Sequence, residues 1–120
     1  MTVSEDKFVI IPYNWNTTAA TGYYSESGLQ GTWINFTLPN LRTSQEWQDV
    51  FYKKNKYLAL PRMGNKIYYS ENGYDWNSAT LPSSISGQYP TKFSFENNNY
   101  IFMGGKEIFS SSDGINWTKK

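Results

Sequence analysis

The chain has 120 residues, a formal net charge of +1 at pH 7, and neither cysteine nor histidine. This length suits one domain with a core of its own, and the missing side chains exclude disulfides, thiolate sites and a histidine general base. The near-neutral charge gives no electrostatic reason to bind nucleic acid or an acidic membrane.

No stretch of about 18 apolar residues occurs, and residues 1–6 lack the pattern of a signal peptide. We therefore expect a chain without a secretion signal that is made in a cytoplasm. Released or assembled particles can still carry such a protein outside a cell.

Short segments of β-forming residues with alternating side-chain character follow one another along the chain, and no segment has sustained helical periodicity. In chain order, the strands expected ahead of the hairpins described next cover residues 8–11, 47–52, 57–60, 92–96 and 100–103. Asparagine-containing turns are expected at residues 54–55 and 97–99, because asparagine tolerates positive φ.

Three hairpins share one pattern, in which a strand ends in a serine, passes through a polar turn and resumes at a tryptophan. The turn residues are Ser25, Gly28 and Trp33 in the first copy, Ser70, Asn72, Gly73 and Trp76 in the second, and Ser111, Asp113, Gly114 and Trp117 in the third. The first copy carries two extra residues between its glycine and its tryptophan.

Each residue of this turn has an expected role. The Asn72 or Asp113 side chain can accept backbone N–H groups, the glycine supplies positive φ, and the serine hydroxyl holds the end of the strand. The tryptophan is expected to pack on the hairpin. Burying an indole removes roughly 200 Å² from water, worth at most about 5 kcal/mol.

The spacing of these repeats predicts the fold class. The later two serines lie 41 residues apart (70 to 111), and four short antiparallel strands at such a period are typical of a propeller blade. We predict an all-β, propeller-like single domain over residues 1–120, with about three four-stranded blades at 8–39, 45–82 and 91–120. The first unit begins at its second strand, so the first blade is expected to be incomplete.

The third turn has the form Ser-x-Asp-Gly-x-x-Trp and resembles the Asp-box repeat of sialidases, other glycosidases, photosystem assembly factors, bacterial surface propellers and phage virion proteins. The resemblance covers almost the whole chain, although Asn72 and Ser27 stand where the first two copies would carry the aspartate. In those families the box is a folding element at the blade periphery. The resemblance therefore implies a fold and says little about function.

No enzymatic activity is expected. A sialidase needs three arginines to hold the substrate carboxylate, and this chain has only Arg42 and Arg62. No catalytic residue and no cofactor are predicted.

Acidic side chains give a weaker alternative. The pairs Glu26 with Glu71 and Asp49 with Asp75 would suit a glycosidase, but we interpret them as solvated charges at loops or strand edges. A calcium site from Glu71, Asp75 and Asp113 lacks a loop with ligand spacing, so no metal is predicted.

Aromatic residues in or beside loops are candidates for binding sugars, because an exposed ring can stack on a pyranose face. The candidates are Tyr13, Trp15, Tyr74 and Tyr89, with Tyr23 as a further loop aromatic. The remaining aromatics, the three box tryptophans among them, are expected to fill the contacts between blades.

Three lysines, Lys53, Lys54 and Lys56, lie beside Tyr52 and Tyr57. This mixture is found in nucleic-acid sites, but we interpret the lysines as solvated charges that keep a hairpin edge soluble. No nucleic-acid or membrane partner is predicted.

Closed single-chain propellers have at least about four blades, so both ends of this array would expose apolar faces. We expect another copy to cover them, as in a six-bladed ring of two chains, or a larger assembly to do so. The predicted function is a non-enzymatic structural or adhesive component of a phage virion, such as a decoration, tail or fibre protein, with itself or other virion proteins as partners. The alternative is a soluble, oligomeric lectin that binds glycans.

Overall fold

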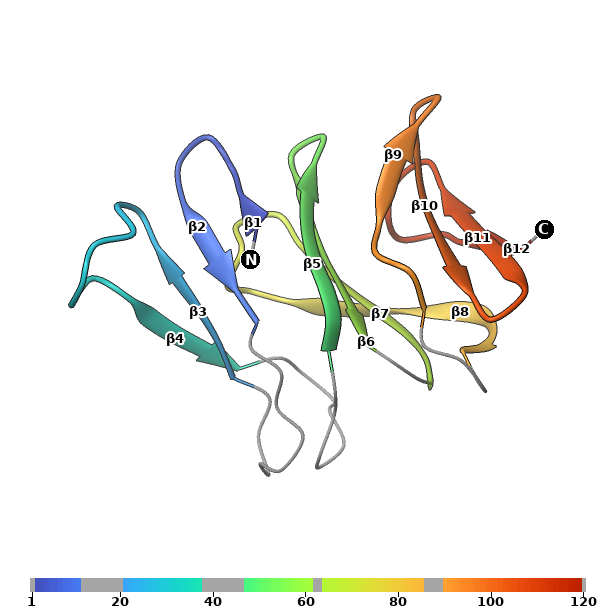
Figure 1. Ribbon diagram of the computed structural model, residues 1–120, viewed down its shortest axis with the longest axis horizontal. Coiled ribbons are helices and arrows are strands. Elements are labelled where there is room, and N and C mark those ends of the chain that lie inside the picture. Colours follow the sequence, from blue (N-terminus) through green and yellow to red (C-terminus); the bar gives the residue numbers. More distant parts are fainter. Residues whose placement is uncertain (1, 12–20, 38–46, 62–63, 86–89, 120) are drawn as a thin grey trace.

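The computed structural model describes residues 2–11, 21–37, 47–61, 64–85 and 90–119. Within these ranges the chain forms β-strands and no helix (Figure 1). The strands make three antiparallel four-stranded sheets, and each sheet is built from strands that are consecutive in the sequence. The all-β prediction is thereby confirmed.

The three sheets follow one another in chain order. Sheet 1 contains β1 (Thr2–Val3), β2 (Phe8–Ile10), β3 (Thr21–Ser25) and β4 (Ile34–Thr37). Sheet 2 contains β5 (Trp47–Lys53), β6 (Lys56–Pro61), β7 (Gly64–Ser70) and β8 (Asn77–Ile85). Sheet 3 contains β9 (Ser94–Glu96), β10 (Asn99–Gly104), β11 (Glu107–Ser111) and β12 (Thr118–Lys119).

Sheet 1 has all four strands, so the prediction of an incomplete first unit is wrong. The missing strand is β1, in which Thr2 pairs with Val9 and Val3 with Phe8. A strand of two residues is too short to display alternation in a sequence, which is why it escaped prediction.

The turns between the first two strands of sheets 2 and 3 lie where asparagine predicted them. Lys54 and Asn55 have φ values of 54° and 61°, and Asn97 and Asn98 have values of 51° and 61°. Two successive residues with positive φ form the type I′ turn that suits a two-residue hairpin. Asn99 already belongs to β10.

Two separate hydrophobic cores lie between the sheets. The first joins sheet 1 to sheet 2 and contains Val9, Ile11, Phe36, Val50, Tyr57, Ala59, Tyr68 and Trp76. The second joins sheet 2 to sheet 3 and contains Leu58, Leu60, Ile67, Leu81, Ile85, Phe93, Tyr100, Phe102, Phe109 and Trp117. Sheet 2 is therefore covered on both faces.

Each sheet has a rear face, which is directed toward the preceding sheet, and a front face, which is directed toward the next one. In sheet 2 the rear face carries Tyr57 and Tyr68, and the front face carries Leu58 and Ile67. Side chains alternate between the two faces along each strand. The rear face of sheet 1 and the front face of sheet 3 are called the outer faces.

Candidate functional site: the sheet interfaces and the outer faces

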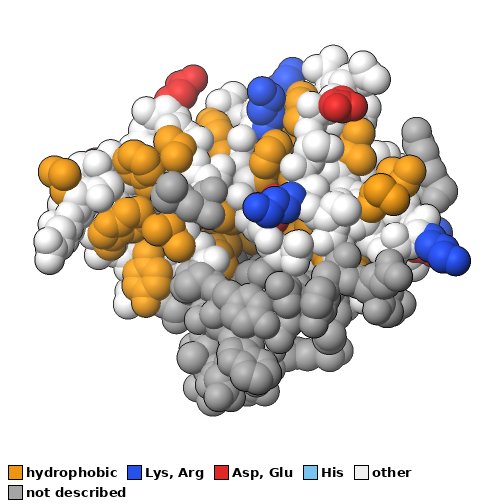
Figure 2. Space-filling model, viewed as in Figure 1, with side chains coloured by type: hydrophobic (Ala, Val, Ile, Leu, Met, Phe, Trp, Pro, Cys, Tyr) orange, Lys and Arg blue, Asp and Glu red, His pale blue; other side chains and the backbone are white. Residues whose placement is uncertain are grey.

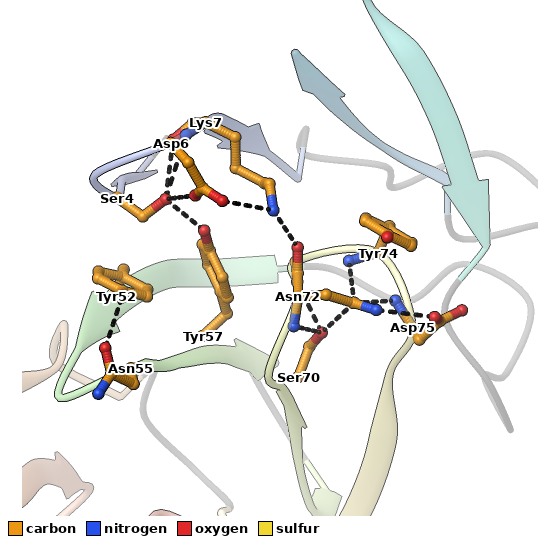
Figure 3. Close-up of polar contacts among 11 residues, drawn as sticks. Ser4, Asp6, Lys7, Tyr52, Asn55, Tyr57, Ser70, Asn72, Tyr74 and Asp75 are labelled. Atoms are coloured by element: carbon orange, nitrogen blue, oxygen red, sulfur yellow. Dashed lines mark hydrogen bonds and ion pairs between the residues drawn. The ribbon is translucent and has the colours of Figure 1, made fainter. Parts of the chain in front are cut away.

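The second box turn, residues 70–76, is held by side-chain acceptors (Figure 3). The Ser70 hydroxyl oxygen accepts the N–H groups of Gly73 at 2.8 Å and Asn72 at 3.3 Å. The Asn72 amide oxygen accepts the N–H groups of Tyr74 at 3.0 Å and Asp75 at 2.8 Å. The backbone N–H groups of the bend, which cannot pair with a neighbouring strand, thus find hydrogen-bond acceptors within the turn itself.

The third box turn, residues 111–117, repeats this arrangement with a carboxylate. Ser111 Oγ accepts the Gly114 N–H at 2.8 Å, and Asp113 Oδ1 accepts the N–H groups of Ile115 and Asn116 at 2.9 and 2.8 Å. Partial burial raises the pKa of Asp113. The backbone donors of Asn116 and Ile115, with the Asn116 amide and the Ser111 hydroxyl, outweigh it and hold that pKa well below its usual range.

The tryptophans of these two turns are buried and hydrogen-bonded. Trp76 Nε1 donates to the Gly73 carbonyl and Trp117 Nε1 to the Gly114 carbonyl, both at 3.1 Å. The Trp76 ring stacks on Phe36 of sheet 1 with centroids 5.8 Å apart. The indole therefore links its own turn to the interface between two sheets.

The first box turn, residues 25–33, uses hydroxyl groups instead. Ser25 Oγ accepts the Gly28 N–H at 2.9 Å and lies 2.6 Å from the Thr32 hydroxyl, which also accepts a bond from Ser27 Oγ at 3.1 Å. Trp33 is only half-buried, with its ring 6.4 Å from that of Phe8. Its contribution is accordingly smaller than the full indole burial expected from the sequence.

A lysine from each of the first two sheets reaches the box turn of the next sheet. Lys7 Nζ donates to the Asn72 carbonyl at 2.9 Å, as Figure 3 shows. Lys56 Nζ donates to the Asp113 carbonyl in the same way. The interpretation of Lys56 as a solvated edge charge is therefore wrong, because its ammonium group is bound to the neighbouring sheet.

A tyrosine hydroxyl makes the reverse contact, from each later sheet back to a turn of the preceding one. Tyr57 donates to the Ser4 hydroxyl in the β1–β2 turn, and Tyr100 donates to the Lys53 carbonyl at the β5–β6 turn. Burial raises the pKa of both phenols. Each interface therefore has two recurring hydrogen bonds. A lysine of the earlier sheet donates to the box turn of the later one, and a tyrosine of the later sheet donates to a turn of the earlier one.

These contacts were not predicted from the sequence, because each of them joins residues of two different units. The repeats, aligned on the second strand of each unit, place Lys7–Phe8, Lys56–Tyr57 and Asn99–Tyr100 at equivalent positions. That alignment was the signal that could have identified both residue types.

The box glycines lie against the preceding sheet. A Cβ atom at Gly73 would be 3.1 Å from Val9 Cγ2, and one at Gly114 would be 3.0 Å from Lys56 Cδ and 3.1 Å from Leu58 Cδ2. The turns have positive φ at both positions, 91° and 79°. Glycine is required there both by the backbone conformation and by the space available.

Asp49 also joins two sheets. Its Oδ2 accepts the backbone N–H of Phe93 at 2.9 Å, which connects β5 to the segment before β9. Burial raises the pKa of the Asp49 carboxyl, and the Phe93 hydrogen bond only partly offsets it. The interpretation of Asp49 as a solvated charge is wrong, because the side chain lies at the sheet 2–sheet 3 interface.

A polar groove of about 270 Å³ lies between the β1–β2 turn and sheet 2. Its lining residues are Glu5, Asp6, Lys7, Tyr52, Asn55, Tyr57 and Glu71. Tyr52 is half-buried, its ring centroid lies 4.5 Å from that of Tyr57, and its hydroxyl donates to Asn55 Oδ1 at 3.3 Å. The groove thus combines an aromatic ring with several hydrogen-bonding groups, some of them visible in Figure 3.

The outer faces carry hydrophobic side chains that none of the three described sheets covers. On sheet 1, Val3 is 51% exposed and Tyr23 is 39% exposed, beside half-buried Ile10. On sheet 3, Met103 is 41% exposed and Ile108 is 38% exposed. Figure 2 shows hydrophobic side chains gathered over sheet 1.

Of the predicted sugar-binding aromatics, Tyr74 and Tyr23 fall within the described residues, whereas Tyr13, Trp15 and Tyr89 lie outside them. The expected loop position of Tyr23 is wrong, because this residue belongs to strand β3. Tyr74 stacks on Tyr24 of sheet 1 with centroids 4.7 Å apart, and Lys7 Nζ lies 5.6 Å from its ring centroid. One side of the Tyr74 ring is thus occupied by the contact between two sheets.

The acidic side chains considered for a calcium site, Glu71, Asp75 and Asp113, are not brought into a metal-binding group among the described residues. Glu26, Glu71 and Asp75 are exposed, and Asp75 accepts a bond from the Asn72 amide at 2.8 Å. Among the described residues, no three His, Cys, Asp or Glu side chains are arranged to hold a metal ion.

The same part of the chain contains no helix long and apolar enough to cross a membrane. Comparisons with protein-family models, with curated proteins and with solved structures find no match. The function is therefore argued from the interfaces and outer faces.

Proposed function

We propose that this chain is a non-enzymatic structural or adhesive protein, a propeller-like array of three blades that assembles through its two outer faces. One observation carries the proposal. The rear faces of sheets 2 and 3 and the front faces of sheets 1 and 2 supply the residues of the two cores, whereas the faces at the two ends of the described array expose Val3, Tyr23, Met103 and Ile108 and supply none. Ile34, on the last strand of the front face of sheet 1, is exposed as well. Exposed apolar faces of this kind are typical of protein contacts.

The Ser-x-Asp-Gly-x-x-Trp turn supports a place for this assembly in a phage particle, as a decoration, tail or fibre protein. Similar turns occur in phage virion proteins, and that resemblance is the support for a virion location. Its partners would be other copies of itself or other virion proteins.

Solution mass tests the assembly. Light scattering behind a sizing column, over a hundredfold range of concentration, is expected to show species heavier than the 13.9 kDa monomer. A variant carrying Tyr23→Glu and Met103→Glu places a charge on both outer faces and is expected to remain monomeric. If the two proteins have the same mass at every concentration and neither binds the surface of purified particles, assembly through these faces is refuted.

Carbohydrate binding is the second candidate, favoured by the groove beside Tyr52. The volume of about 270 Å³ is near the lower limit of ligand pockets, roughly 300 Å³, which suits a single sugar ring. Asn55 and Glu71 would bind hydroxyl groups while the Tyr52 ring contacts the apolar side of the sugar.

A glycan array separates the two candidates. Saturable binding that is lost in Tyr52→Ala and kept in Met103→Ala, a control that removes an exposed side chain from an outer face, favours the lectin. Trp15→Ala tests the sugar-binding candidate that lies outside the described residues. A silent array favours assembly.

A further inference from the structure

We infer that copies of this chain join head to tail, with the front face of sheet 3 of one copy packed on the rear face of sheet 1 of the next. This inference rests on the proposed function and specifies the partner as a second copy of the chain. It is argued from the register of the strands, which places equivalent residues of the three sheets on equivalent faces.

The rear faces share one register. Tyr57 pairs with Ser70 and Tyr100 with Ser111, and in sheet 1 Phe8 pairs with Ser25. Tyr57 and Tyr100 are only 1% and 2% exposed, because the preceding sheet covers them. Phe8 occupies the same position on sheet 1, the first of the described sheets.

The front faces are related in the same way. Val9 pairs with Tyr24 and Leu58 with Tyr69, and both Val9 and Leu58 are fully buried by the following sheet. The equivalent residue of sheet 3 is Ile101, which pairs with Ser110 and is half-buried. Among the three described sheets, one rear face, that of sheet 1, and one front face, that of sheet 3, thus have no facing sheet.

A second copy supplies both missing neighbours. The two interfaces within the chain each join a front face to a rear face, through separate cores. A head-to-tail contact continues that established interface, whereas a contact between two like faces has no counterpart in the fold. Such a heterologous contact closes into a ring where the rotation allows and otherwise extends into a filament.

The polar contacts of the internal interfaces are absent at the two ends. Asn99 stands where Lys7 and Lys56 donate to the next box turn, and Phe8 lacks the hydroxyl that Tyr57 and Tyr100 direct to the preceding sheet. Contact between copies therefore keeps the apolar component and loses both recurring hydrogen bonds. The association is weaker than the internal interfaces and reversible with concentration.

Variants in which one outer face is blocked test whether a front face contacts a rear face. Met103→Glu with Ile108→Glu blocks the front face, and Val3→Glu with Tyr23→Glu blocks the rear face. All four side chains are already exposed, so the fold is expected to survive, which circular dichroism and thermal unfolding verify. Each variant alone should be monomeric, and an equimolar mixture should give a dimer of one front-intact and one rear-intact chain.

The alternatives are separated by the same samples. A variant that dimerises alone uses like faces, which overturns the head-to-tail order while leaving assembly through the outer faces standing. A mixture that stays monomeric under conditions where the wild-type chain associates also overturns it. A wild-type chain that is monomeric at every concentration refutes self-association, whatever its binding to particles.

Restoring the missing hydrogen bonds gives an independent test. Asn99→Lys places an ammonium group opposite the Ser27 carbonyl of the next copy, the position that corresponds to Asn72 and Asp113. Phe8→Tyr restores the hydroxyl. Each change should lower the dissociation constant about threefold to tenfold, as expected for one net hydrogen bond. Asn99→Met, which lengthens the side chain without the charge, should leave that constant unchanged, and an equal effect of both would contradict the inference.

Discussion

The first box turn differs from the other two in what lies next to it. The second and third turns pack against a preceding sheet and bury their tryptophans, and a Cβ atom added to their glycines would lie about 3 Å from side chains of that sheet. No described sheet precedes the first turn, which leaves Trp33 half-buried. In place of asparagine or aspartate it has Ser27, whose hydroxyl accepts the Leu29 N–H and donates to the Thr32 hydroxyl. The comparison teaches that the buried tryptophan and the crowded glycine belong to the interface between sheets, whereas the serine–glycine hydrogen bond is common to all three turns.

The largest expected difference concerns the tryptophans. Trp117→Ala removes a buried indole that contacts Phe102 and Phe93, and it should lower the free energy of unfolding by about 3–5 kcal/mol. Trp33→Ala should cost about 1–2 kcal/mol, because part of that ring is already in water. Urea denaturation measures both. Equal losses would mean that the two turns are anchored alike.

Substituting two glycines by alanine separates the cost of backbone strain from the cost of steric crowding. Gly114 and Gly31 have similar φ values, 79° and 83°, but a Cβ atom at Gly31 would have no neighbour within 4 Å. Gly31→Ala should therefore cost only the conformational strain, about 1–2 kcal/mol. Gly114→Ala should cost roughly 1–3 kcal/mol more, because Lys56 and Leu58 must shift. Thermal unfolding of the two variants would show no difference if the third turn were not pressed against sheet 2.

The serines test the hydrogen bonds of the turn. Ser111→Ala leaves the N–H groups of Asp113 and Gly114 without their acceptor, and the Gly114 bond is buried, so the expected loss is about 1–3 kcal/mol. Ser25→Ala should cost less, because the bond to Gly28 is only partly buried and water can replace it. Hydrogen exchange of the Gly114 and Gly28 amides checks the assignment, since each should accelerate only in its own variant.

The smallest effect concerns the acid side chain of the third turn. The pKa of Asp113 is lower folded than unfolded, so its ionised form stabilises the fold above about pH 4, and this contribution is lost as the pH falls further. Asp113→Asn copies the second turn, which already carries Asn72. It should change the midpoint of thermal unfolding little at pH 7 and should reduce the loss between pH 4 and pH 2. A variant as acid-sensitive as the wild type would assign that sensitivity to other carboxylates.

The sequence was sufficient where the signal is local and repeated. The asparagines predicted a turn within residues 97–99, which the structure forms as a type I′ turn at Asn97–Asn98. The serine-to-tryptophan spacing predicted three hairpins. The strand β1 was missed because two residues have no periodicity. The roles of Asp49 and Lys56 were not predicted, because their partners, Phe93 and Asp113, belong to another repeat. The residue pattern within one repeat does not indicate which residues of the next repeat it contacts.

The separation of the two cores determines the order in which parts of the protein unfold. Within the described part of the chain, sheets 1 and 3 share no core residue, and both pack on sheet 2. In such a nearest-neighbour system an end sheet can open and close while the opposite core stays formed, whereas unfolding of the middle sheet abolishes both. The middle sheet is therefore the unit whose opening requires global unfolding, and the two ends are free to rearrange during assembly without loss of the molecule.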